Sequence, residues 1–320
     1  MGLASNADNI RYYGTGRAYE GAVGGASFND LGELENFNFG LTVTTDKLKS
    51  TRNAARGTLI EKITESEAKV TFGLKEMTNE NLKIALLSDA VAADNQAAGY
   101  IYQDDPEWVE DEYIDLGKIN VFSVKLTGAI TGTLAAGDTV TGETSAATGK
   151  IAYKAAGYIE VVNVSGTFQV GEEVYKTADT HYITTTGVEV QDDVVVTDVT
   201  GVTRRAQGDD YSLDPDYGYI RRLSAGDMED TDVVSYDHEA VTKNVIQGMS
   251  ASSVERKIIF VSDKDDNGIR QRWTFHKVNI LMNGEFPLIG EGAAVLAVTG
   301  TVLKDSNQAS GEEYYKAETM

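Results

Sequence analysis

The segment Asp263–Gly268 is the part of the sequence that comes closest to a metal-binding motif. Its oxygen-bearing side chains stand at positions 1, 3 and 5 of a calcium-loop pattern, and a glycine stands at position 6. Position 12, where such loops carry a bidentate Glu, is Thr274, and the flanking residues alternate as strands do. Asn267-Gly268 between two strands is a strong hairpin signal. We therefore predict a β-hairpin at this position and no metal site.

Histidine, cysteine and carboxylate side chains form no catalytic or cofactor-binding pattern in the sequence. His181, His238 and His276 lie far apart, without the spacing of metal ligands, and cysteine is absent. There is no nucleophile elbow, no phosphate-binding loop and no zinc-protease motif. Acidic pairs such as Glu33/Glu35 are uninformative among 50 acidic residues. The sequence therefore predicts a protein that is not an enzyme and holds no cofactor and no metal.

A short basic cluster contrasts with the acidity of the whole chain. Lys47, Lys49, Arg52 and Arg56 lie within ten residues, whereas the chain has 50 acidic and 28 basic residues and a net charge of −22. Such acidity disfavours a phosphate-reading surface for nucleic acid. The cluster is either a solvated loop or an interface that docks on an acidic surface of another copy. These four residues are the candidate interface residues.

The composition predicts strands joined by glycine turns, with 32 glycines, 3 prolines and 16 tyrosines. Phe37–Val43 and Ala68–Leu74 alternate with a period of two, as half-buried strands do. The alternation stops between them, over residues 44–58, which predicts a long loop. Thr78 is a plausible N-cap for a helix that runs to about Asp89.

Changes in composition divide the chain into three parts. Residues 1–27 are rich in small residues and predict an extended N-terminal arm. Residues 28–124 and 194–320 form one β-domain, in which Trp108 anchors an acidic stretch. Glycines recur every four to seven residues at the start of 125–193, and short strands follow. This segment predicts an inserted small all-β domain, a sandwich or a barrel.

Apolar stretches are short throughout the chain. No run approaches the roughly 20 residues of a membrane span, and the first residues lack the charged and apolar regions of a secretory signal. The absence of cysteine fits a reducing compartment. We expect a soluble protein that is made in a cytoplasm and has no membrane partner.

The order of the elements resembles that of the major tail tube protein of long-tailed bacteriophages. The resemblance covers about residues 1–120 and 195–320 and leaves out the inserted domain. It rests on Asp30–Glu35 opening a strand, the long loop, Ala68–Leu74 as the returning strand, Thr78–Leu86 as the helix, Asp210–Ile220 with its turn, and the closing segment from Phe275 to Leu303.

The resemblance implies a mainly β fold: a β-sandwich or half-barrel with one flanking helix, carrying the inserted domain on the outside. Six copies would form a ring, and rings would stack through arms and long loops into a hollow tube in the virion tail. The partners would be further copies and other tail proteins, and DNA would pass through the lumen without sequence-specific binding. Residues 44–58 would then stack the rings, acidic side chains would line the bore, and the outward domain would suit a non-contractile tail.

Two other functions fit the same sequence. One is another β-protein of the virion, such as a decoration or tail-completion subunit. The second is a glycan-binding module in the inserted domain, where Tyr153, Tyr158, Tyr175 and Tyr182 could contact sugars, although no Trp accompanies them.

Overall fold

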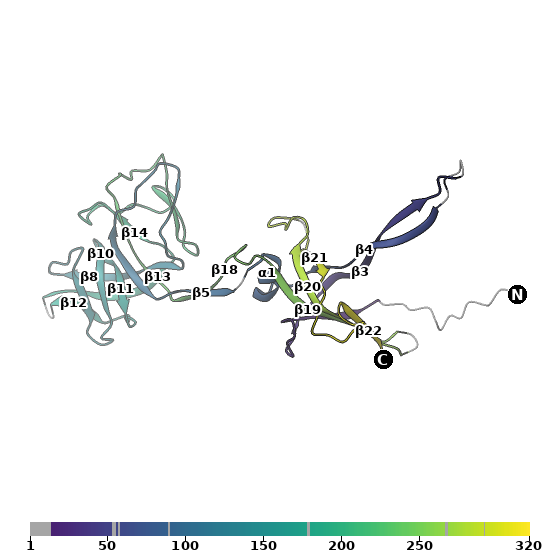
Figure 1. Cartoon of the computed structure of the whole chain (residues 1–320). Helices are drawn as coiled ribbons and strands as arrows, with labels where there is room; N and C mark the ends of the chain where they lie inside the picture. The colour runs from purple at the N-terminus through teal and green to yellow at the C-terminus, as the bar shows by residue number, and fades with distance from the viewer. Residues whose placement is uncertain are drawn as a thin grey trace. The chain divides into compact units, whose positions relative to one another are not determined.

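The computed structural model describes residues 14–52, 56, 58–88, 90–177, 180–265, 268–290 and 292–320 (Figure 1). It is mainly β, as the sequence predicts. The chain divides into two compact units: unit 1 comprises residues 1–93 and 244–320, and unit 2 comprises residues 94–243.

The secondary structure elements are distributed over the two units as follows. Unit 1 contains β1 (Gly16–Gly21), β2 (Asn29–Asp30), β3 (Leu34–Lys49), β4 (Thr58–Leu74), α1 (Asn79–Ala85), β19 (Val254–Ser262), β20 (Gln271–Met282), β21 (Leu296–Val302) and β22 (Tyr315–Thr319). Unit 2 contains β6 (Gly99–Asp104), β7 (Tyr113–Asp115), β8 (Val121–Thr131), β9 (Thr139–Gly142), β10 (Thr148–Ala155), β11 (Tyr158–Ser165), β12 (Glu173–Thr177), β13 (His181–Gln191), β14 (Val195–Thr197), β15 (Tyr211–Asp214), β16 (Tyr219–Arg222) and β17 (Val233–His238). The chain passes from unit 1 to unit 2 within β5 (Val91–Gln96) and back within β18 (Val241–Ile246), and these two strands pair with each other.

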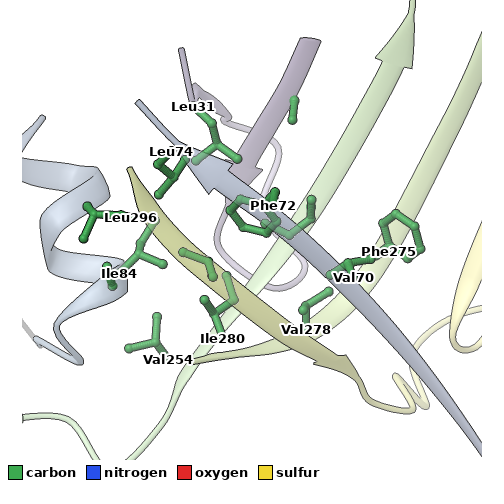
Figure 2. Close-up of a cluster of buried hydrophobic side chains, with 14 of the residues drawn as sticks. Leu31, Val70, Phe72, Leu74, Ile84, Val254, Phe275, Val278, Ile280 and Leu296 are labelled. Atoms are coloured by element: carbon green, nitrogen blue, oxygen red, sulfur yellow. The ribbon is translucent and has the colours of Figure 1, made fainter. Parts of the chain in front are cut away.

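Unit 1 is built on one antiparallel sheet that curls around a hydrophobic core (Figure 2). Its strand order is β2-β1-β19-β20-β21-β4-β3, and β22 pairs with β20. Val70, Phe72 and Leu74 of β4 point into the core, which confirms the predicted alternation. The ring of Phe37 in β3 lies 4.8 Å from that of Phe260 in β19, although three strands separate β3 and β19 in the sheet. The sheet is therefore curled enough to bring its two ends together over the core.

Helix α1 begins where the sequence predicts, because Thr78 caps it. The Thr78 hydroxyl accepts a hydrogen bond from the backbone N–H of Asn81 at 3.2 Å. Ile84 and Ala85 are buried against the core of unit 1. The helix ends at Ala85, earlier than predicted, and the predicted last residue, Asp89, lies outside the described residues.

Unit 2 contains a closed six-stranded barrel made of β8 to β13. The strands follow the order β11-β10-β9-β12-β13-β8, and β11 also pairs with β8, which closes the ring. Leu126, Ile151, Ile159 and Ile183 fill its interior. The predicted segment 125–193 corresponds closely to this barrel. Its glycines allow close packing: a Cβ on Gly128 would lie 1.9 Å from the Thr184 carbonyl oxygen.

The barrel is only part of unit 2, and this differs from the predicted boundaries. Residues 94–124 and 194–243 pack with it and not with unit 1. β17 extends the barrel sheet by pairing with β8, and β6 and β14 pair with β17. Trp108 is buried in a second core beside the barrel, which confirms its anchoring role. The sequence gives no sign of these pairings because each joins segments far apart in the chain.

The predicted N-terminal arm, residues 1–27, is wrong for its second half. Gly16–Gly21 forms β1, which pairs with β19 over its whole length, and Ala18 is completely buried. The small residues that suggested an arm permit this close pairing, because a Cβ on Gly16 would meet the ring of Phe260. Residues 1–13 lie outside the described residues.

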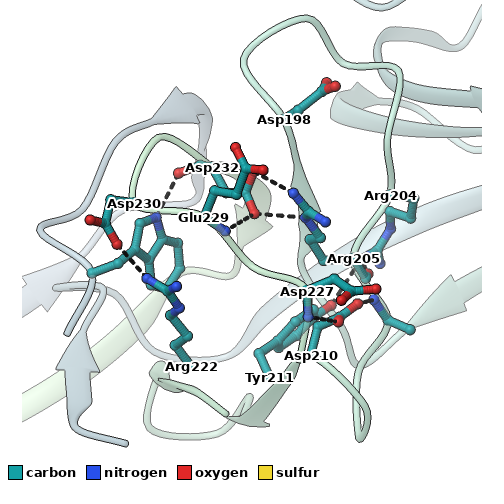
Figure 3. Close-up of polar contacts among 12 residues, drawn as sticks. Asp198, Arg204, Arg205, Asp210, Tyr211, Arg222, Asp227, Glu229, Asp230 and Asp232 are labelled. Carbon is teal, nitrogen blue, oxygen red and sulfur yellow. Dashed lines mark hydrogen bonds and ion pairs between the residues drawn. The ribbon is translucent and has the colours of Figure 1, made fainter. Parts of the chain in front are cut away.

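Two neighbouring arginines hold unit 2 together through buried ion pairs, and Figure 3 shows the pair between Arg205 and Asp232. Arg205 binds the Asp232 carboxylate at 2.7 Å, and the indole of Trp108 donates to the Asp232 carbonyl oxygen at 2.6 Å. Arg204 binds Glu160 on the barrel strand β11 at 2.8 Å. Burial in low dielectric disfavours these charges unless they are paired. The Arg204–Glu160 pair therefore fixes the second core against the barrel, and the Arg205–Asp232 pair stabilises the region outside the barrel.

The Arg204 guanidinium is satisfied on several sides. Besides Glu160 it binds Asp193 at 2.9 Å and the hydroxyl of Tyr211 at 3.0 Å. Burial alone would lower the pKa of Arg204, but its interactions with Tyr211, Glu160 and Asp193 outweigh this effect and raise the pKa. Burial raises the pKa of the Tyr211 hydroxyl. This cluster is saturated with its own hydrogen bonds, so we interpret it as structural.

Candidate self-assembly surface

The outer part of the β3–β4 hairpin leaves the sheet of unit 1 and continues as two strands alone (Figure 1). β21, the next strand of the sheet, pairs with β4 only from Leu74 to Lys69. Beyond that point, residues 41–52, 56 and 58–67 have no third strand beside them among the described residues. We call these residues the distal ribbon. A two-stranded ribbon of this kind is marginally stable in water by itself.

The distal ribbon exposes large apolar side chains on both of its faces. Leu41 and Val43 continue the face of the core residue Phe39, whereas Leu48 and its cross-strand partner Ile60 lie on the opposite face. The six residues concerned are 44% to 64% exposed: Leu41, Val43, Leu48, Leu59, Ile60 and Ile63. Isolated surface apolar residues are common, but a group of this size on one element indicates a contact with another molecule.

The four predicted interface residues lie at the outer end of this ribbon. Lys47 forms an ion pair with Glu61 across the two strands at 3.2 Å. The pKa of the Glu61 carboxyl is lowered by a hydrogen bond from Thr45 and by Lys47. Lys49, Arg52 and Arg56 form no ion pair with other described residues.

The charge at this end of the ribbon is opposite to that of the chain. Residues 47–62 contain five basic residues and one acidic residue, a net charge of +4 in a chain of −22. We call this part the basic end. Its lysine and arginine side chains are exposed and available to a partner.

The loop between β3 and β4 is shorter than the predicted loop 44–58. β3 continues to Lys49, so Lys47 and Lys49 stand on a strand and not in a loop. The register shifts between Thr44 and Thr45 and again between Leu48 and Lys49. Such bulges interrupt the regular cross-strand alternation. Both shifts place the extra residue in β4, however, so the sequence periodicity of β3 stops for another reason: residues 44–49 have no buried face that would require alternation.

An acidic groove lies between the first residues of β3 and the edge of β1. It has a volume of about 660 Å³ and is bordered by Arg17 and by five carboxylates: Asp30, Glu33, Glu35, Glu76 and Asp263. Thr15 donates to Asp263 at 2.6 Å, and the backbone N–H of Glu33 donates to Glu76 at 2.9 Å. Glu33 and Glu35 remain exposed. The groove thus presents an excess of negative charge within unit 1.

The chain matches the model of one known protein family. Residues 11–165 and 155–314 match the family described as "Protein of unknown function UCP028589". The chain belongs to this family. A search of curated proteins found no match.

The calcium-like segment forms the predicted hairpin. β19 and β20 on either side of it pair in antiparallel fashion, with Val261 opposite Arg272. Asp266 and Asn267 lie outside the described residues. In the described ranges, no group of three or more His, Cys, Asp or Glu residues could hold a metal ion.

The histidines are not brought together by the fold. His238 lies in β17 of unit 2 and His276 in β20 of unit 1, and both are buried. Burial lowers the pKa of each imidazole. His181 is the first residue of the barrel strand β13, and its Nδ1 atom lies 3.1 Å from the hydroxyl oxygen of Thr180. We interpret all three as packing residues.

One buried carboxylate in unit 2 was not singled out by the sequence. Asp237 accepts backbone N–H groups of Asn163 and Val164 at 2.5 and 3.1 Å. Burial raises its pKa to about 6, and the two hydrogen bonds oppose this rise. Asp237 and His238 are consecutive in a strand and therefore point to opposite faces. They do not form an acid–base pair.

None of the described helices is long and apolar enough to span a membrane.

Proposed function

We propose that this chain is a structural subunit that assembles into stacked rings, with six copies in a ring, to form the hollow tail tube of a bacteriophage. DNA would pass through this tube without sequence-specific binding. The observation that carries the proposal is the distal ribbon, which is apolar on both faces and basic at its end. Such a ribbon is stabilised only when another protein surface covers it.

Charge complementarity favours a second copy of this chain as the covering partner. The acidic groove borders the first residues of β3, and the basic end lies at the last residues of the same strand. One copy can therefore place its basic end on the groove of the next, and the contact can be repeated without limit. A heterologous contact of this type generates rings or open stacks.

The edge of the unit 1 sheet supplies a second contact. β3 is the last strand in the sheet order, so its outer edge has no neighbour among the described residues of this chain. Exposed edges of this length are templates for pairing with another chain. We infer that neighbouring sheets join at this edge within a ring.

The face of the sheet opposite the core is a candidate for the bore of the tube. Along one cross-strand row it presents Asn38, Thr71, Thr299 and Leu281, which carry no charge. Lys69 and Lys277 lie on the same face, but each forms an ion pair, with Glu67 at 3.1 Å and with Glu255 at 2.9 Å, which makes them less available to the DNA phosphates. An acidic bore remains a prediction.

Assembly of the purified protein tests the proposal by electron microscopy. Long hollow tubes support it, whereas monomers or isolated trimers favour a decoration or tail-completion subunit. The triple variant K49E/R52E/R56E should remain folded and form no tubes. The control K118E/K154E/K176E makes the same change of net charge in unit 2 and should still assemble. Normal tubes from the first variant would refute the role of the basic end.

A charge-swap experiment tests the pairing of the basic end with the groove. The variant D30K/E33K/E35K changes the net charge of the residues that border the groove from −4 to +2, and it should not assemble alone. Mixed with K49E/R52E/R56E, it should form tubes of alternating subunits, because each reversed surface then meets its complement. Failure of the mixture to assemble would show that the basic end docks elsewhere.

A further inference from the structure

The three-stranded sheet β15-β16-β7 of unit 2 presents an aromatic face to solvent, and this face belongs to neither the barrel nor the self-assembly surface. Its inner side chains, Ile114, Leu213 and Ile220, pack against the second core of unit 2. Because strands alternate, the residues between them point outward. The outer face therefore consists of two cross-strand rows, with Tyr113, Arg221 and Ser212 in one row and Asp115, Tyr219 and Asp214 in the other.

The tyrosines on this face are strongly exposed. Tyr113 is 66% and Tyr219 is 43% exposed, and Tyr217, in the turn before β16, is 62% exposed. The rings of Tyr217 and Tyr219 stack with centres 6.2 Å apart and planes inclined by 12°. These two stacked rings form an exposed aromatic platform at the surface. Beside it lies a hollow of about 520 Å³ that Tyr113 and Tyr219 help to line.

Polar groups of fixed position surround the hollow. The Arg221 guanidinium lies 5.6 Å from the ring centre of Tyr113 and is held there by Asp111 at 3.1 Å. One carboxylate oxygen of Asp115 accepts the N–H of Gly117 at 2.7 Å, which fixes the orientation of that carboxylate. Ser212 also lines the hollow, but its hydroxyl oxygen is buried and has no hydrogen-bond partner among the described residues. Aromatic walls with a few oriented polar groups are typical of small-ligand sites.

We propose that this face, called here the tyrosine face, binds neutral oligosaccharides. The faces of pyranose rings carry C–H groups that pack against the electron-rich faces of aromatic rings. The paired hydroxyls of a sugar can donate to the carboxylates of Asp115 and Asp214, which stand on either side of Tyr219. The proposal does not depend on tube formation.

The charge around the tyrosine face selects among possible ligands. Residues 104–117 contain seven acidic and no basic residues. Such a surface repels nucleic acid and acidic polysaccharides. Protein interfaces are enriched in Tyr and Arg but depleted in Asp at their centres, so the composition of this face alone does not exclude a protein partner, and the experiment below includes that outcome. A neutral glycan satisfies both the aromatic and the carboxylate groups.

The barrel, in contrast, offers no such platform. Tyr153 and Tyr158 are partly buried, and the ammonium of Lys125 covers the ring of Tyr158 at 4.4 Å. Tyr175 and Tyr182 are also partly buried and face each other across β12 and β13. The glycan-binding hypothesis therefore moves from residues 125–193 to a face made of segments outside the barrel.

Binding of the full chain to an array of neutral and acidic oligosaccharides, followed by calorimetric titration of the best neutral one, tests this inference. The variant Y217A/Y219A should weaken binding at least about tenfold, because each lost stacking contact is worth a few-fold to tenfold. Y217F/Y219F keeps the rings and should stay within about threefold of the parent. The control Y314A removes a tyrosine of similar exposure from unit 1 and should bind as the parent does.

Three results would overturn the inference. The first is that no neutral oligosaccharide binds the full chain. The second is that the best oligosaccharide binds Y217A/Y219A, with unchanged thermal stability, as tightly as the parent. The third is that the Tyr-to-Ala changes alter self-association but not oligosaccharide binding, which would make the tyrosine face an interface between proteins. Failure of the chain to form tubes would leave the tyrosine face unaffected.

Discussion

The double variant L48S/I60S gives the sharpest measure of the distal ribbon's role. These two residues face each other across β3 and β4 and are 59% and 60% exposed in the single chain. Complete burial of such a side chain is worth about 1.5–3 kcal/mol. Covering the exposed part of each therefore contributes about 1–2 kcal/mol, or about 2–4 kcal/mol for the pair, to each contact between copies.

This energy sets the size of the expected effect. At about 1.4 kcal/mol for each tenfold change, the loss corresponds to a rise of about 30-fold to 1,000-fold in the critical concentration for assembly. The isolated subunit should be nearly unaffected, because surface substitutions usually change the free energy of unfolding by less than about 0.5 kcal/mol. Sedimentation velocity over a concentration series measures the first quantity, and thermal unfolding measures the second.

A matched control distinguishes the ribbon from a general effect of polarity. V199S/V202S replaces two aliphatic residues of unit 2 that are 57% and 70% exposed. It should leave the critical concentration within a few-fold of the parent. If both double variants shift assembly equally, or if L48S/I60S shifts it less than about threefold, the ribbon is not a principal contact and the reasoning fails.

Two further predictions concern the stability of unit 2. Because burial raises the pKa of Asp237 to about 6, its ionisation should cost stability as pH rises from about 4 to 6, by about 3 kcal/mol in all. D237N should abolish this slope in urea-unfolding measurements, and an unchanged slope would show that another group is responsible. R204A leaves the buried Glu160 and the partly buried Asp193 without their cation and should destabilise unit 2 by about 3–5 kcal/mol. K176A, which breaks a half-exposed ion pair with Asp138, should cost at most about 1 kcal/mol, and equal losses would contradict the structural role of Arg204.

The sign of the pH effect follows from the direction of the shift. A carboxyl whose pKa is higher in the folded than in the unfolded chain binds its proton more tightly when folded. The stability that Asp237 contributes is fully present below pH 3.8, which is the pKa of the group in the unfolded chain. It is lost as the pH rises through about 6, the pKa in the folded chain. Asp198 shows the reverse case. Partial desolvation alone would raise the pKa of its carboxyl, but hydrogen bonds with Val202, Thr200 and Thr203 lower it to about 2. The stability that Asp198 contributes is lost as the pH falls from about 4 to 2, whereas that of Asp237 is lost as the pH rises from about 4 to 6. The two residues therefore affect stability in different pH ranges.

Local sequence patterns predicted those elements that depend on neighbouring residues. The alternation of Ala68–Leu74 identified a core strand, because a period of two puts every second side chain on one face. Thr78 identified the start of the helix, since its hydroxyl satisfies a backbone N–H three residues away. The hairpin predicted at Asp263–Gly268 agrees with the antiparallel pairing of β19 with β20, which end at Ser262 and begin at Gln271. In each case the determining contact lies within a few residues.

The candidate sites were only partly visible in the sequence. The basic cluster was found because charge contrast does not require a fold. Leu48 and Ile60 were missed because Leu48 lies in the predicted loop 44–58 and Ile60 lies outside the predicted strands. Their exposure on a two-stranded ribbon depends on where β21 stops pairing. Tyr113 and Tyr219 were missed because they are separated by more than 100 residues and become neighbours only through the pairing of β7 with β16.

The sequence by itself therefore determined the mainly β class, the helix start, the hairpin and the position of the basic cluster. Only the tertiary structure decided the boundaries of the two units, the place of β1 in a sheet and the exposure of the ribbon. The physical reason is that these depend on pairings between distant strands, such as β1 with β19 and β8 with β17. Their stability comes from backbone hydrogen bonds and shared cores, which leave no periodic signal in either segment alone.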